Sequence, residues 1–250
     1  MANGPGSATR RPQLEWEGPG DVGVATASTS TWVHAPRQAR SQETFDRFLG
    51  STMALLREKS FDDITVTDIV QGADRTVGSF YARFDDKYAV LYELVSRTYT
   101  HIGTIVHAFC DPVRWDGQPI RAFVEESVRL NVAGYRHSTP LFRAALRAAA
   151  SDERFRDRRT DFLRYCADEQ RAFVLTRRDE LSTDSPGRAS DHMFEIVVAV
   201  LDQELLFGRL TTTSPHTDHE LARELVDQAL HALGIPSPAV DARSAVGHGY

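Results

Sequence analysis

Small side chains and aromatic rings share one short helical segment of this sequence, "VGSFYARF". Gly78, Ser79 and Ala82 stand where a surface helix normally carries long polar side chains. Phe80 and Phe84 are four residues apart, so they lie together on another side of the helix. Because glycine inside a helix costs about 1 kcal/mol relative to alanine, Gly78 needs a reason. Either a neighbouring helix packs against it, or another molecule approaches the helix backbone closely.

Residues around this segment could bind nucleic acid. The major groove of duplex DNA admits one α-helix, and small side chains let that helix come close enough to reach base edges. Arg75 and Thr76 precede the helix, where backbone N–H groups and the helix dipole favour an anion. Tyr81 and Arg83 extend from the same helix, and Lys87 begins the next one. Singly, Tyr81 could be partly buried and Lys87 a solvated helix start, but together these residues indicate contact with DNA.

The helix before this segment has strong start signals. Thr65 is typical of an N-cap, and Asp68 three residues later completes a capping box. Ile64 and Ile69 are spaced to form a hydrophobic staple at the same helix start. After the turn "GADR", Thr76 is placed to cap the next helix. Two helices joined by a turn of about four residues predict a helix-turn-helix.

Helical periodicity continues on both sides of this motif. An amphipathic first helix runs from Ser41 to about "EKSFDD". A long fourth helix, capped by Asp85 or Asp86, runs until Asp111 and Pro112. No alternating pattern of any length indicates a strand, so the sequence predicts an all-α protein. Further helices are expected at about residues 119–136, 140–150, 152–181, 190–210 and 217–233.

Composition limits the class of protein. The 250-residue chain has 41% apolar residues and a net charge of −6, which argues against a surface coated with phosphate-binding residues but allows a local one. No apolar run approaches the ~20 residues that span a bilayer, and no export signal is apparent, so we expect a cytoplasmic protein without membrane contact. Cys110 and Cys166 lack metal-ligand spacing and are expected as buried free thiols, with no metal and no cofactor.

The sequence does not predict an enzyme. No nucleophile has a paired base, no glycine loop could cradle a phosphate, and the histidines are isolated from one another. The charged run from Ser151 to Glu180 is better explained by a solvated helix face than by catalysis.

Three segments resemble the TetR family of bacterial transcriptional regulators. "TVTDIV", "GSFYARF" and "DDKYAVL" look like the family's Thr-Val-x-Asp-Ile-Ala, Gly-Thr-Phe/Leu-Tyr-x-His-Phe and Ser-Lys-Glu-x-Leu. The resemblance covers residues 41–95, and the remainder only through length and helical layout. In the turn, "DRT" replaces the family's Gly-Val-Ser. Asp74 can adopt the left-handed conformation at modest cost, whereas Arg75 replaces a buried apolar residue and either points outward to DNA or packs differently. Arg83 stands where the family often has His, and could add a phosphate or guanine contact.

The resemblance implies a function. It implies a repressor that binds a palindromic operator in double-stranded DNA as a homodimer and is released by a small-molecule effector. A divergent member that acts through protein contacts, or an activator, is the alternative that the "DRT" turn keeps open. The DNA-binding residues that we expect are Arg40, Thr65, Arg75, Thr76, Val77, Gly78, Ser79, Tyr81, Arg83 and Lys87.

The resemblance also implies dimerisation through the last two helices. Their apolar stripes suit a four-helix interface between two copies, although an intramolecular core would account for part of each stripe. The stripes comprise Phe194, Val197, Val198, Leu201 and Leu205, followed by Leu221, Leu225, Ala229 and Leu233.

An effector site is expected in the second half of the chain. Polar residues lie among apolar ones in the helix after residue 119, and a buried Asn131 must find a partner in an effector, a backbone carbonyl or a water. The aromatic residues nearby could line an apolar cavity or form core. The effector-binding residues that we expect are Phe109, Phe123, Ser127, Asn131, Tyr135, Phe142, Phe162 and Tyr165.

These expectations divide the chain into four parts. We expect a disordered N-terminal extension at residues 1–36, because it is rich in Gly, Pro, Ser and Thr and has no periodicity. A helix-turn-helix DNA-binding domain follows at 37–90, a helical effector-binding and dimerisation domain at 91–236, and a loose tail at 237–250.

Overall fold

The computed structural model describes residues 39–208 and 217–236, with side chains from residue 42 onward. Within these ranges the chain forms nine α-helices, three short 3-10 helices and no β-strand, so the all-α prediction is correct. The expected N-terminal extension and C-terminal tail lie outside the described residues. In the described part, no helix is long and apolar enough to cross a membrane.

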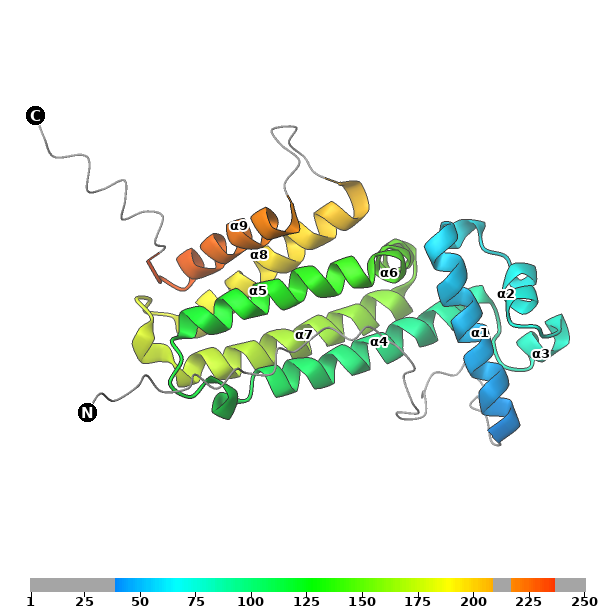
Figure 1. Ribbon diagram of the computed structural model, residues 1–250, viewed down its shortest axis with the longest axis horizontal. Helices are drawn as coiled ribbons and strands as arrows, with labels where there is room; N and C mark the ends of the chain where they lie inside the picture. Colours follow the sequence, from blue (N-terminus) through cyan, green and yellow to red (C-terminus); the bar gives the residue numbers. More distant parts are fainter. Residues whose placement is uncertain (1–38, 209–216, 237–250) are drawn as a thin grey trace, which may run out of the picture.

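Residues 42–86, here called the head, lie at one end of the molecule (Figure 1). Four aromatic rings fill the centre of the head, and each is at most 2% exposed. Phe45 stacks on Phe84 with ring centroids 4.8 Å apart, and Phe48 meets Phe80 edge-on at 5.4 Å. The two rings predicted behind the small-residue face therefore do anchor it. The helical elements of the head are α1 (Ala39–Glu58), which begins just before it, η1 (Phe61–Asp63), α2 (Val66–Gly72) and α3 (Val77–Tyr81).

The third helix is shorter than its sequence pattern suggests. α3 has five residues, and Ala82 is its C-cap. The amides of Arg83 and Phe84 both donate to the carbonyl of Phe80, which closes a turn directly before the next helix. Phe84 thus reaches the core from this turn.

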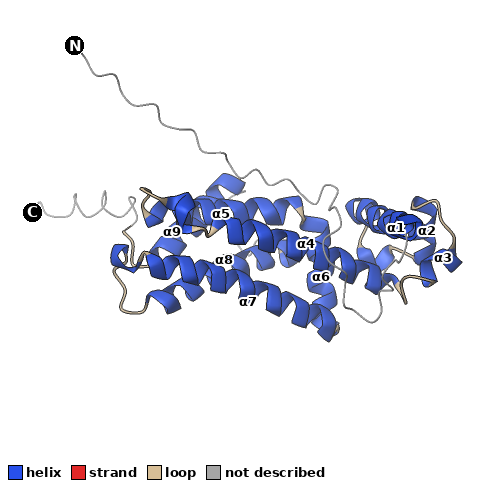
Figure 2. Ribbon diagram, turned by 90° about the horizontal axis from the view of Figure 1, so that it is seen from below, coloured by secondary structure: helices blue, strands red, loops and turns tan. Residues whose placement is uncertain are grey.

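The remaining helices form a bundle that α4 joins to the head (Figures 1 and 2). The sequence located them well, although the expected helix at 152–181 ends at Thr176 and the one expected from 190 begins at Pro186. Proline fits a first helical turn because the N–H that it lacks would have no helical partner there. The elements are α4 (Lys87–Phe109), η2 (Pro112–Trp115), α5 (Ile120–His137), α6 (Thr139–Ser151), α7 (Glu153–Thr176), η3 (Arg178–Glu180), α8 (Pro186–Phe207) and α9 (Asp218–Ala232).

Two large apolar cores run through the described residues. One joins the head to α6 and the start of α7, so the head is packed onto the bundle rather than attached by α4 alone. The other fills the far end of the bundle around an aromatic group, in which Trp115 donates its indole N–H to the carbonyl of Phe109 at 2.7 Å. Phe123 stacks on Phe173 in this group with centroids 4.1 Å apart.

Candidate DNA-contact surface and internal cavity

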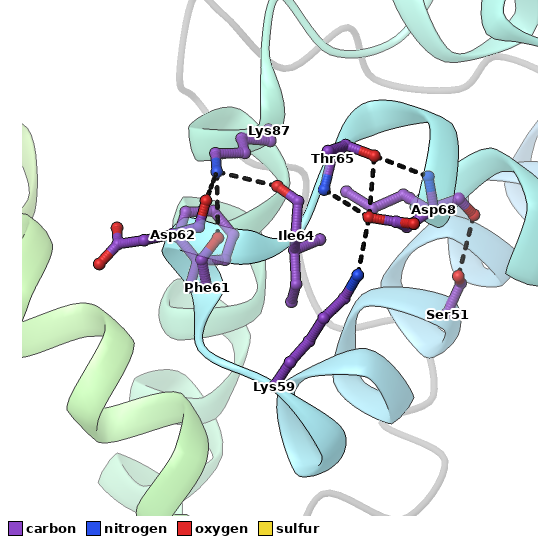
Figure 3. Close-up of polar contacts among 9 residues, drawn as sticks. Ser51, Lys59, Phe61, Asp62, Ile64, Thr65, Asp68 and Lys87 are labelled. Atoms are coloured by element: carbon purple, nitrogen blue, oxygen red, sulfur yellow. Dashed lines mark hydrogen bonds and ion pairs between the residues drawn. The ribbon is translucent and has the colours of Figure 1, made fainter.

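The start of α2 is a closed capping box, as predicted. The hydroxyl of Thr65 accepts the N–H of Asp68 at 3.1 Å, and the Asp68 carboxylate accepts the N–H of Thr65 at 2.8 Å. The Lys59 ammonium donates to the same carboxylate at 2.9 Å (Figure 3). These bonds, that of Lys59 foremost, lower the pKa of Asp68 to about 2. The Thr65 hydroxyl, expected to reach DNA, also donates to Asp68 at 2.8 Å, although Thr65 itself is exposed.

The turn between α2 and α3 takes the unusual conformation that its sequence predicted. Asp74 has a φ of 54°, in the left-handed region that Asp tolerates better than most residues. Arg75 folds back on α1, where its Nε donates to the Thr44 hydroxyl at 3.3 Å and its Nη2 lies 3.5 Å from the Glu43 carboxylate. Of the two alternatives for Arg75, the structure therefore favours the different packing.

The small-residue face of α3 is open. Gly78 is exposed, and a Cβ built on it would meet nothing within 4 Å, so no neighbouring helix explains this glycine. Val77 and Tyr81 flank it with 46% and 53% of their surfaces exposed. The Ser79 hydroxyl donates to the carbonyl of Thr76 at 2.8 Å, and the Ser79 amide donates to the Thr76 hydroxyl at 3.2 Å. This face is available to another molecule.

The cations expected beside this face are turned inward. Arg83 donates from Nη1 to the carbonyl of Ser79 at 2.8 Å. Lys87 donates to carbonyls of the segment between α1 and α2, at distances of 2.8 to 3.0 Å. A lysine ammonium has only three donors, so Lys87 could reach a phosphate only by giving up one of these bonds, and its expected contact with DNA stays a prediction. Arg40 lies in the first turn of α1, and its side chain is outside the described residues.

A cavity of about 90 Å³ lies inside the bundle between α4, α5, α6, α7 and α8. Six of the eight expected effector residues line it, namely Phe109, Ser127, Asn131, Tyr135, Phe142 and Phe162. The sequence missed Tyr99, Arg159, Gln170 and Asp202, which also line it.

Two of the expected effector residues do not line this cavity. Phe123 is fully buried in the aromatic group at the far end of the bundle. Tyr165 is 40% exposed on the surface between α4 and α7, and its hydroxyl is 3.5 Å from the carbonyl of Gly103. Helical spacing alone could not place these two side chains relative to this cavity, because it does not identify what each side of a helix meets.

Polar groups occupy two parts of the cavity wall. Tyr135 donates its hydroxyl to Asp202 at 2.9 Å, and Arg159 forms an ion pair with the same carboxylate. Burial raises the pKa of Asp202, and the Arg159 charge opposes that rise. Elsewhere the Ser127 hydroxyl lies 3.3 Å from the amide oxygen of Gln170.

The partner of the Asn131 side chain is a backbone carbonyl and not a ligand. Its side-chain amide donates to the carbonyl of Ser127 at 2.9 Å, so a backbone carbonyl is the partner. Asn131 thus needs no ligand to satisfy that donor.

The apolar stripes of α8 and α9 form intramolecular core. Each of the nine residues expected at a dimer interface is at most 8% exposed within the single chain. Those residues are therefore not the interface, although another face of α8 stays open. That face carries Ala199, the half-buried Ile196 and Val200, and Phe207 with 76% of its surface exposed.

The fold is that of TetR-family transcriptional regulators. A Mesorhizobium loti protein assigned to that family superposes with a TM-score of 0.62 at 17% identity, covering 79% of this chain and 100% of the other. PfmR from Thermus thermophilus matches with a TM-score of 0.53 at 16% identity, over 74% of this chain and 98% of its own. RolR, solved in complex with resorcinol, matches at 0.50 and 18% identity, over 84% and 96%. No protein-family model and no curated protein matches the sequence.

Proposed function

We propose that this chain is a TetR-family transcriptional regulator, a dimeric repressor that binds a palindromic operator and is released by a small molecule. The observation that carries the proposal is the open face of α3. Gly78 has nothing within 4 Å of its Cβ position, and Val77 and Tyr81 beside it are about half exposed. A helix with such a face, held from behind by buried rings, suits a major groove.

The contacts with DNA then divide into two kinds. Val77, Gly78 and Ser79 face base edges, and Thr76 and Tyr81 face phosphates. Arg75, Arg83 and Lys87 donate hydrogen bonds to groups of the head, so they add little to phosphate binding. With these charges turned inward, we expect modest nonspecific affinity and a shallow salt dependence.

We propose that two copies pair through the open face of α8, with α9 alongside. This face presents Ile196, then Ala199 and Val200 one turn later and Phe207 two turns after Val200, with Gln203 between them, which suits close packing of two helices. A two-fold axis between the copies would match the symmetry of a palindromic site.

We propose that the effector binds in the cavity lined by α4, α5, α6, α7 and α8. The ion pair of Arg159 with Asp202 leaves that end of the wall formally neutral, which favours an uncharged ligand over an anion or a cation. An apolar cavity of roughly 150 Å³ holds benzene, so a ring-sized ligand would have to push apart the walls of this smaller one. Tyr99 of α4 and Phe142 of α6 belong to those walls; α4 runs to the head, and α6 packs against the head.

A regulator that acts through protein contacts is the second candidate. The inward cations favour it, because few charges around α3 remain for phosphates. Binding of the purified chain to duplex DNA distinguishes the two candidates.

The direct test is fluorescence anisotropy with the DNA upstream of the chain's own gene and with a random duplex of equal length. We expect the upstream duplex to bind at least a thousandfold more tightly. Tyr81→Ala should weaken this binding, whereas Tyr165→Ala, which removes an exposed tyrosine from the bundle surface, should not. Equal affinity for both duplexes would contradict the repressor and favour protein contacts.

A further inference from the structure

We propose that Lys87 is a positioning residue that fixes the head on α4. Its ammonium donates to the carbonyl oxygens of Phe61 at 3.0 Å, Asp62 at 3.0 Å and Ile64 at 2.8 Å (Figure 3). These three bonds use all the donors of a lysine ammonium. A phosphate could bind this side chain only after at least one of them broke.

The three acceptors converge because the segment between α1 and α2 is folded. The amide of Asp63 donates to Ser60, and that of Ile64 donates to Phe61, which closes η1 and turns the carbonyls toward one side. The Lys87 ammonium also lies 4.9 Å from the centre of the Phe61 ring. Hydrogen bonds from a charged donor are about twice as strong as neutral ones. The sequence spacing of 23 to 26 residues makes this link a tertiary one.

Other polar links between the head and the bundle act elsewhere or are weaker. Arg97 of α4 pairs with Asp46, which ties α4 to α1. Arg147 of α6 donates to the Ser60 hydroxyl at 3.4 Å and approaches Asp62 to 3.9 Å, but both side chains of the ion pair are more than half exposed, and such pairs contribute little. Lys87 instead donates to the carbonyl of Ile64, the residue directly before Thr65, which is the N-cap of α2. It therefore sets where α2, and with it α3, stands relative to α4.

This role rests on the proposed function as a dimer on a palindromic site. In such a dimer, the position of α3 relative to α4 determines the distance between the two reading helices. A loosened head would accept half-site spacings that the native protein rejects. Lys87 thus sharpens the preference for one spacing, without itself contacting DNA.

The test compares full-length Lys87→Met and Lys87→Arg with Lys59→Met. Lys59 is the matched control, because it is the other lysine near this segment and bonds only Asp68 within the head. Lys87→Arg keeps the charge that a phosphate would need, but a planar guanidinium fits three converging carbonyls poorly. If Lys87→Met does not fold, Lys87→Arg alone still distinguishes the positioning role from a phosphate contact.

Two measurements are made on each variant. The first is amide hydrogen exchange at Asp63 and Ile64, which does not require DNA. The second is affinity for duplexes whose half-sites differ in spacing by one base pair, over a range of salt.

We expect both Lys87 variants to exchange several-fold faster at these amides and to lose several-fold in their preference between spacings, with an unchanged salt slope. Lys59→Met should keep the spacing preference. A salt slope smaller by about 0.9, the value for one phosphate, would overturn the proposal. An equal loss of affinity for duplexes of every spacing would also overturn the proposal, since it would indicate that Lys87 only stabilises the fold. If the wild-type chain binds no DNA, the proposed function fails, and exchange alone then supports or overturns the link to α4.

Discussion

Replacing Gly78 with glutamine should separate folding from DNA binding. Gly78 is exposed and a Cβ there would meet nothing within 4 Å, so the new side chain can extend into solvent, and it gains helix propensity of up to about 1 kcal/mol. For a chain of this size that gain raises the Tm by about 2–4 °C. The same side chain stands between α3 and the groove, and losing the fit at one base pair of a specific site costs about 1–3 kcal/mol. We therefore expect Gly78→Gln to be at least as stable as the wild type and to bind its operator about tenfold to a hundredfold more weakly.

Gly50 supplies a matched control. It is also an exposed helical glycine, in α1, and a Cβ there would also meet nothing within 4 Å. Gly50→Gln should gain a similar stability without changing DNA affinity. Thermal unfolding followed by circular dichroism and operator titration by fluorescence anisotropy measure both quantities. If Gly78→Gln bound the operator as tightly as the wild type, α3 would not enter the groove through this face, and the reasoning from small residues would be refuted.

Three further predictions concern the interior and the capping box. Phe123→Ala should lower the free energy of unfolding by about 3–5 kcal/mol in urea titrations, because it empties a fully buried aromatic site, and a decrease below about 1 kcal/mol would contradict that packing. Burial raises the pKa of Cys110 and of Cys166 to about 12, so neither thiol should react with a disulfide reagent at pH 8 until the chain unfolds. The Asp68 carboxyl should titrate near pH 2 by NMR, and its contribution to stability, present above its unfolded pKa of about 4, should fade as the pH falls through 2. Lys59→Met should raise that midpoint, and an unchanged midpoint would show that the Lys59 hydrogen bond is not its main cause.

Local signals in the sequence predicted local structure well. The capping box of Thr65 and Asp68 joins residues three apart, and the left-handed conformation of Asp74 depends on its own side chain. The aromatic pair behind α3 was also predictable, because helical spacing identifies which side is buried. These features depend on short stretches of chain.

Features that depend on distant partners were not predictable. Lys87 binds backbone carbonyls, which every residue has, so no residue type in the sequence marks its partners. Arg159 lies in a run interpreted as a solvated helix face, yet it points to Asp202 at the cavity wall. The stripes of α8 and α9 were correctly predicted as apolar, but periodicity does not tell whether the covering surface belongs to the same chain.

Because α4 is long, a small rotation about one of its ends produces a large displacement at the other. Its 23 residues, at about 1.5 Å each, make a rod of about 34 Å. If the rod turned by about 6° about its Phe109 end, its Lys87 end would travel about 3.5 Å, close to the roughly 3.4 Å rise of one base pair. Tyr99, nearer the fulcrum by more than half the length, would move only about 1.6 Å. A ligand that moved the middle of α4 by about 1.6 Å would thus move its start by about one base-pair rise, provided that the core joining the head to α6 and α7 moved with it.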